Sequence, residues 1–190
     1  MSNTAVLKSP VKPQLSVKAQ TLATIAAIVG AVAVPQIFHA LGAVSGLGTA
    51  PGEVLLPMHL PIIVVGLLAG PYAGVVSGLL GPLVSFALSG MPGIVMLPFM
   101  MIELCSYGLC AGLLRGVNLP SIAKVIITQI AGRAVRAAAI LLAVYAFGND
   151  SVQIAVIWKS IATGVFGIVL QLALLPLIVY RVENLKKNEE

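Results

Sequence analysis

The sequence predicts an all-α integral membrane protein with six transmembrane helices, both termini cytoplasmic and a long first outer loop. The first observation is composition: the 190 residues are 59% hydrophobic and only 9% charged, whereas a soluble domain has about 25% charged residues. The second is length, because a hydrocarbon core about 30 Å thick needs about 20 apolar residues per helix. Six helices with short connections therefore fill the chain. A water-soluble enzyme, a disordered chain and a collagen-like chain are excluded.

The hydrophobic segments are separated by short polar or glycine- and proline-rich connections. A basic tail covers residues 1–20, for which a cleaved signal peptide is the other interpretation. The membrane domain covers residues 21–182 and a second cytoplasmic tail covers residues 183–190. The six predicted spans are residues 21–41, 58–69, 72–89, 93–114, 121–147 and 154–180.

The first connection, residues 42–57, is rich in glycine, alanine and proline. It is too irregular for a helix through lipid, so we expect it outside the membrane or covered by protein. The next connections are also short: SGMPG at residues 89–93, RGVNLP at residues 115–120 and GNDS at residues 148–151. They are typical of turns between neighbouring helices.

The charges outside the spans fix the predicted orientation, which is the third observation behind the fold class. With both termini inside, the outer loops contain Glu53 and Asp150 but no Lys or Arg. The inner segments contain eight basic residues: Lys8, Lys12, Lys18, Arg115, Lys124, Arg181, Lys186 and Lys187. Since basic loops stay in the cytoplasm, we expect both ends there.

Small residues recur at four-residue spacing in three places, which lets membrane helices approach closely. Two glycine sets favour packing within the bundle: Gly66, Gly70, Gly74 and Gly78, and Gly108, Gly112 and Gly116. An alanine stripe, Ala23, Ala27 and Ala31, lies on one face of the first span beside the basic tail. This stripe is either internal packing or a docking face for another membrane subunit.

Four ionisable residues fall inside predicted spans: Glu103, Arg133, Arg136 and Lys159. Each is costly in lipid and needs a partner or a water-filled cavity. Glu103 and the two arginines have similar predicted depths, so we expect a pair between them. One carboxylate cannot neutralise three cations, and a surplus buried cation favours a site that receives an anion. The alternatives are an arginine that reaches backbone carbonyls or the interface, and a Lys159 that extends outward to water.

Other polar side chains could line the same cavity. Gln129 precedes Arg133 by one helical turn, and Gln171 lies deep in the sixth span. His39 and His59 flank the first outer loop, and Trp158 is near the outer interface, where a tryptophan is more often an anchor than a ligand contact. Neither these histidines nor Cys105 and Cys110 form a metal-ligand spacing. The phosphate-binding G-x-x-x-x-G-K-[ST] loop does not occur in the sequence.

Residues 20–182 resemble the S components of energy-coupling factor (ECF) transporters, which are small vitamin-binding membrane subunits of prokaryotes. The resemblance includes the six spans, the basic N-terminus, the alanine stripe and the long first loop. It also includes residues 55–93, LLPMHLPIIVVGLLAGPYAGVVSGLLGPLVSFALSGMPG. This segment is similar to the pattern Pro-Met-His-x-Pro, Gly-Pro-x-x-Gly, Gly-x-x-x-Pro-Leu, Thr/Ser-Gly-Met-Pro of a subgroup that we interpret as pantothenate-type.

The resemblance implies a non-catalytic, multi-pass subunit of the prokaryotic plasma membrane that captures a vitamin from outside. Its partners would be a transmembrane coupling subunit, which the alanine stripe contacts, and two cytosolic ATPases, which would use ATP and Mg²⁺. This chain itself would bind no cofactor or metal. The family's pocket draws on the first loop and spans four to six. These elements carry His59, Glu103, Tyr107, Gln129, Arg133, Arg136, Trp158 and Lys159.

Pantothenate is the expected vitamin, because its carboxylate suits a surplus arginine. Few aromatic residues argue against a large flat ring. Hydroxymethylpyrimidine, pyridoxine and a cobalamin-type ligand remain open, as does a membrane scaffold subunit with no ligand.

Overall fold

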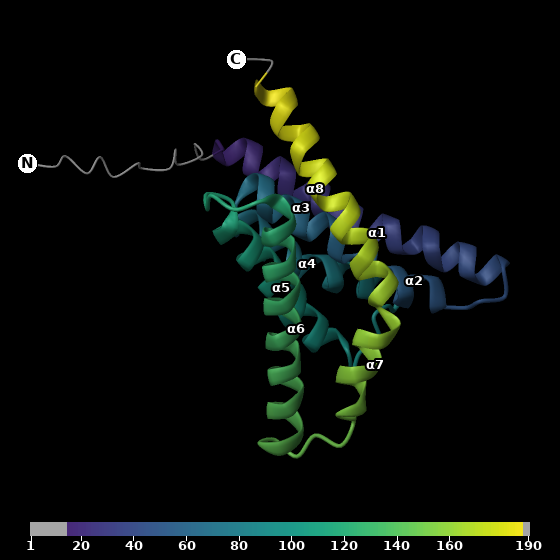
Figure 1. The fold of residues 1–190 in the computed structure, drawn as a ribbon. Coiled ribbons are helices and arrows are strands. Elements are labelled where there is room, and N and C mark those ends of the chain that lie inside the picture. Colours follow the sequence, from purple (N-terminus) through teal and green to yellow (C-terminus); the bar gives the residue numbers. More distant parts are fainter. Residues whose placement is uncertain (1–14, 188–190) are drawn as a thin grey trace, which may run out of the picture.

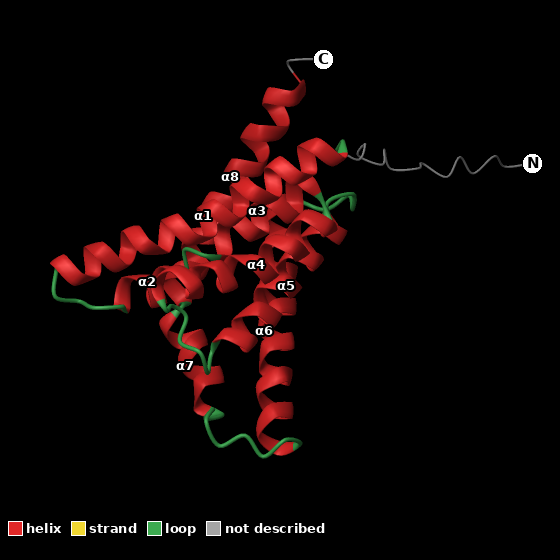
Figure 2. Ribbon diagram, turned by 180° about the vertical axis from the view of Figure 1, so that it is seen from behind, coloured by secondary structure: helices red, strands yellow, loops and turns green. Residues whose placement is uncertain are grey.

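The structure of the protein is a computed structural model that describes residues 15–187, and side chains as far as Val182. This part of the chain is all-helical and contains no strand (Figure 2). The helices are α1 (Val17–Val44), α2 (Ala50–Leu55), α3 (His59–Ala69), α4 (Pro71–Ser89), α5 (Leu97–Leu114), α6 (Ser121–Tyr145), α7 (Ala155–Thr163) and α8 (Val165–Lys187).

Six segments of the described residues are long and apolar enough to cross a membrane. They are Val17–Val44, Ala50–Ala69, Pro71–Ser89, Leu97–Leu114, Ser121–Tyr145 and Val165–Val182. The predicted fold class and number of spans are therefore confirmed. The placement of the termini in the cytoplasm stays a prediction. The start of α1, the α5–α6 connection and the end of α8 lie at one end of the bundle, opposite the α6–α7 connection (Figure 1).

The first and last helices extend beyond the predicted boundaries of the membrane domain. Helix α1 begins at Val17, inside the predicted tail, because the Ser16 side chain caps it by accepting a hydrogen bond from the Ala19 amide at 3.3 Å. At the other end, α8 continues to Lys187, where we expected a soluble tail from residue 183. The remainders of the two predicted tails, residues 1–14 and 188–190, lie outside the described residues.

The first connection is more ordered than predicted. Helix α1 continues to Val44, and residues 50–55 form α2, with Pro51 in its first turn, a position proline tolerates well. Leu56 ends α2 in the left-handed conformation at φ 50° and ψ 49°. The prediction of an irregular loop throughout residues 42–57 is therefore wrong for residues 42–44, which belong to α1, and for residues 50–55, which form α2.

The sixth predicted span is two helices instead of one. It divides at Gly164 into α7 and α8, where the first connection packs against it. A Cβ added to Gly164 would lie 2.8 Å from the Leu56 Cδ1, and one added to Gly167 would lie 2.7 Å from the Leu55 carbonyl oxygen. These two glycines therefore let the end of α2 rest directly on the α7–α8 junction.

The glycine sets pack helices together, as predicted. Gly74 of α4 and Gly108 of α5 face each other so closely that a Cβ on either would overlap the backbone of the other. Gly66 lies on the same α5 surface, where an added Cβ would be 2.8 Å from the Gly108 carbonyl oxygen. Gly112 meets Pro71 in the same way. Helices α3, α4 and α5 thus form one closely packed unit. Gly116 lies outside this unit in open space.

The alanine stripe faces the interior of this chain. Ala31 is fully buried in the main core with Ile62 and Leu104, and Ala27 is buried against Val65 and Ala73. Ala23 is only partly covered, by this second cluster. A side chain covered by its own subunit cannot contact another one in the same conformation. Ala27 and Ala31 therefore pack inside the chain in this conformation, and their expected role in docking another subunit stays a prediction.

Candidate binding site

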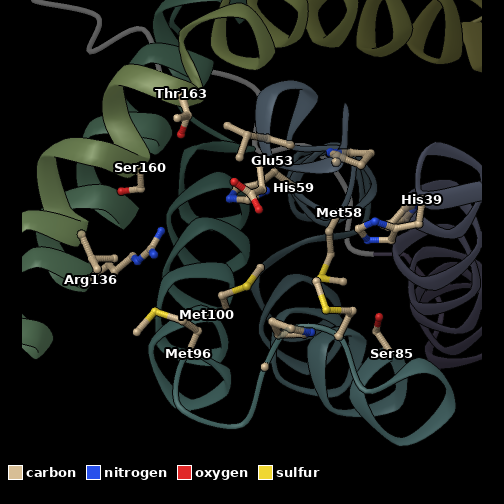
Figure 3. Close-up of a pocket in the computed structure, with 18 of the residues that line it drawn as sticks. His39, Glu53, Met58, His59, Ser85, Met96, Met100, Arg136, Ser160 and Thr163 are labelled. Atoms are coloured by element: carbon tan, nitrogen blue, oxygen red, sulfur yellow. The ribbon is translucent and has the colours of Figure 1, made fainter. Parts of the chain in front are cut away.

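The main cavity has a volume of about 400 Å³ and lies where α1, α2, the α4–α5 connection, α6 and α7 meet. Its apolar lining consists of Pro35, Leu56, Pro57, Met58, Met91, Pro92, Met96, Met100 and Val156, with Gly52 and Gly93. Its polar lining consists of His39, Glu53, His59, Ser85, Arg136, Lys159, Ser160 and Thr163. In Figure 3, Arg136, Ser160 and Thr163 lie on one side of the cavity, and His39 and Ser85 lie on the other.

A buried carboxylate holds the arginine of this cavity in place. Glu103, which is 1% exposed, accepts a hydrogen bond from the Arg136 Nη1 on its Oε2 at 2.9 Å. Its Oε1 accepts a bond from the Tyr107 hydroxyl at 3.0 Å and lies 3.9 Å from the His59 Nε2. The predicted pair between Glu103 and an arginine is therefore confirmed, with Arg136 as the partner.

Six of the eight predicted site residues fall into three groups. His59, Arg136 and Lys159 line the cavity. Glu103 and Tyr107 lie behind this lining, where Tyr107 also stacks at a tilt on His59 with ring centroids 5.3 Å apart. Trp158 is 72% exposed and does not line the cavity, which fits an anchor at the membrane interface better than a ligand contact.

Gln129 does not line the cavity itself and is linked to the cavity lining through Gln171. Its Nε2 donates a hydrogen bond to the Gln171 Oε1, and the Gln171 Nε2 donates to the Leu56 carbonyl oxygen at 3.2 Å. Both glutamines are buried. They therefore connect α6 and α8 to the left-handed residue that ends α2, a segment of the cavity lining.

Arg133 lies outside the main cavity. It lines a separate small cavity, whose other polar lining residues are Glu103, Arg136 and Ser160. Its Nε and Nη2 atoms are buried and have no hydrogen-bond partner among the described residues. We expected one arginine to pair with Glu103 and the other to face the ligand, whereas Arg136 both pairs with Glu103 and lines the main cavity.

Glu53 is a site residue that the sequence analysis placed only in an outer loop. It lines the main cavity from α2 and accepts a hydrogen bond from the Thr49 hydroxyl at 3.0 Å. The two cavities together thus contain the cations Arg133, Arg136 and Lys159 and the carboxylates Glu53 and Glu103. Three cations and two carboxylates leave a net charge of +1. The surplus of positive charge is therefore smaller than the sequence predicted, but it has the same sign.

Methionines were also missed as lining residues. Met58, Met91, Met96 and Met100 all face the cavity, and no Phe, Tyr or Trp of the described chain does. Flexible thioether side chains adapt to irregular ligand surfaces. The only available signal was the position of Met58 and Met91 beside prolines, and Met96 and Met100 had no such signal. Among the described residues, no three His, Cys, Asp or Glu side chains are grouped to hold a metal ion.

Comparison with known proteins gives one family match. The family model described as "ECF transporter, substrate-specific component" matches residues 20–179. This range covers the six membrane-length segments except the first residues of Val17–Val44 and the last residues of Val165–Val182. Neither the curated proteins nor the solved structures gave a match.

Proposed function

The chain belongs to the family of ECF transporter substrate-specific components, and on this premise we propose that it captures pantothenate for ATP-driven uptake. A substrate-binding membrane subunit needs an enclosed site of the right size and charge. The single observation that carries the proposal is the cavity of about 400 Å³ with the Arg136 guanidinium at its wall. This volume is within the range of small-molecule sites.

Arg136 suits the carboxylate of the ligand. Its guanidinium has five N–H donors in a rigid planar fork, and Glu103 takes up Nη1. The Nε atom is buried and has no hydrogen-bond partner among the described residues, so the ligand carboxylate would bind at Nη2. The bond to Glu103 fixes the direction of the fork. Lys159 adds a second positive charge at the same cavity.

The rest of the lining matches the rest of pantothenate. The vitamin has two hydroxyl groups, an amide and a branched aliphatic end. The side chains of Ser85, Ser160 and Thr163 supply hydrogen-bonding groups, and Met58 and Met100 supply apolar surface (Figure 3). A lining without Phe, Tyr or Trp supports a flexible aliphatic ligand over a large flat one that would stack on such rings.

We further propose that transport requires partner subunits, namely a transmembrane coupling subunit and two cytosolic ATPases that use ATP and Mg²⁺. The support is the family membership and the sequence, which lacks the phosphate-binding loop of such ATPases. Almost all the described residues form the helix bundle.

Native mass spectrometry of the purified chain tests the proposal. Protein incubated with an equimolar mixture of pantothenate, hydroxymethylpyrimidine, pyridoxine and cobalamin should retain one pantothenate per chain. Retention of another vitamin would assign a different substrate to the same family. Retention of none would favour a scaffold subunit.

A further inference from the structure

The wall of the main cavity that faces Arg136 carries polar groups of a different kind. His39 of α1 and Ser85 of α4 line this wall (Figure 3). Arg136, Ser160 and Thr163 line the opposite one. Neither α1 nor α4 contributes a Lys or Arg side chain to the lining. The two walls therefore offer different partners to a ligand.

The fold holds the His39 ring at the cavity. A Cβ added to Gly52 would lie 2.9 Å from the His39 Cε1, so this glycine lets the imidazole rest directly on α2. The Nδ1 atom of the ring is buried and has no hydrogen-bond partner among the described residues. Because a ligand cannot reach a buried atom, Nε2 is the ring nitrogen that remains for a bond to the ligand.

Ser85 is surrounded by protein on all sides except that of the cavity. It is only 1% exposed and still lines the cavity. A serine hydroxyl both donates and accepts hydrogen bonds, and a neutral imidazole has one donor and one acceptor nitrogen. These groups match ligand hydroxyls, which also donate and accept. A carboxylate only accepts, and it is better matched by the guanidinium on the other wall.

We propose that His39 and Ser85 bind the hydroxyl end of the ligand and make the site selective for a hydroxylated acid. This inference rests on the proposed function, in which the ligand carboxylate lies at Arg136. The ligand then crosses the cavity, with its carboxylate on one wall and its hydroxyls on the other. An analogue without hydroxyls leaves both side chains unpaired, and a site built to bond a hydroxyl rejects such an analogue.

Calorimetric titration with two ligands of equal charge tests the inference. One ligand is pantothenate, and the other is N-(3,3-dimethylbutanoyl)-β-alanine, in which hydrogen replaces both hydroxyls while the amide and the carboxylate remain. The wild type should bind pantothenate about tenfold more tightly or better. His39→Phe and Ser85→Ala should each weaken pantothenate binding about three- to tenfold, and change binding of the analogue less than about twofold. Retained binding of the analogue shows that the variants are folded.

Ser160→Ala is the matched control for Ser85→Ala, because it makes the same change on the wall of Arg136. It should alter the binding of both compounds by the same factor. Equal affinity of the wild type for both compounds would overturn the inference and leave the proposed function standing. So would losses in His39→Phe and Ser85→Ala that are equal for both compounds, or a loss of selectivity in Ser160→Ala alone, which would mean that the ligand lies the other way round. A wild type that binds neither compound would contradict the proposed function and this inference together.

Discussion

At the scale of single residues, Glu103 sets the geometry of the site. It bonds Arg136 through one oxygen and Tyr107 through the other, and His59 lies 3.9 Å away. Removing one partner of a buried ion pair leaves the other uncompensated, which costs about 3–5 kcal/mol. A lost hydrogen bond to a charged group costs about 1.5–3 kcal/mol. The charge of Glu103 should therefore matter more than the hydroxyl of Tyr107.

Two nearly isosteric substitutions separate these contributions. Glu103→Gln should lower the free energy of unfolding by about 3–5 kcal/mol, and Tyr107→Phe by about 1.5–3 kcal/mol. Chemical denaturation in mixed micelles measures both. Equal losses, or a larger loss for Tyr107→Phe, would mean that the hydroxyl network rather than the ion pair holds the site.

The residue-level prediction from the sequence was partly right for a physical reason. An ionisable residue in lipid requires a partner, so the charges alone predicted the pair between Glu103 and an arginine. The choice of Arg136 over Arg133 depends on side-chain directions that spacing does not give, because both lie on one face of α6. The role of Glu53 could not be found, since it depends on the folding of the first connection over the cavity.

At the scale of elements, α4 and α5 approach most closely at Gly74 and Gly108. Gly108→Ala should destabilise the chain by about 1–3 kcal/mol or more, because the added methyl group overlaps backbone atoms that cannot move independently. Gly116→Ala is the control, because its Cβ would meet nothing within 4 Å. Retention of folded protein on size-exclusion chromatography after graded heating compares them. Equal tolerance of both changes would contradict the observed helix separation.

The end of α2 is fastened to the bundle by Gln171. This side chain donates to the carbonyl oxygen of Leu56, whose left-handed backbone is unfavourable for a non-glycine residue. Gln171→Leu leaves that oxygen without its donor, and the segment should open more readily. We expect pantothenate to dissociate about tenfold faster, since roughly 1.4 kcal/mol corresponds to tenfold. Stopped-flow displacement measures this rate. An unchanged rate would show that Gln171 does not hold the end of α2 in place.

The long helices were predictable and the short ones were not. Sustained apolar runs define α1, α4, α5 and α6, with errors of a few residues at their ends. Helix α2 has only six residues, and the break between α7 and α8 arises where the first connection packs against Gly164 and Gly167. Both features depend on contacts between distant parts of the chain, which local patterns do not report.

At the scale of the whole molecule, the charges predict the orientation in the membrane. The α5–α6 connection and the end of α8 lie at one end of the bundle, and the α6–α7 connection lies at the other (Figure 1). The first two segments contain Arg115 and Arg181, and the third contains Asp150. The positive-inside rule predicts that the basic end lies in the cytoplasm. A cysteine at Ser151 should therefore react with a membrane-impermeant reagent in intact cells, and one at Asn118 should not. The background for both is a chain without Cys105 and Cys110, and reversed labelling would invert the orientation.

The central claim is that the main cavity binds a vitamin through its carboxylate at Arg136, and calorimetric titration tests it most directly. Wild-type protein and the Arg136→Gln and Lys159→Gln variants are titrated with pantothenate and with panthenol, in which an alcohol replaces the carboxylate. Arg136→Gln should weaken pantothenate binding about ten- to a hundredfold and change panthenol binding little, which also shows that the variant is folded. Lys159→Gln should have a smaller effect. If the wild type binds neither compound, or if Arg136→Gln weakens both equally, the carboxylate assignment is contradicted.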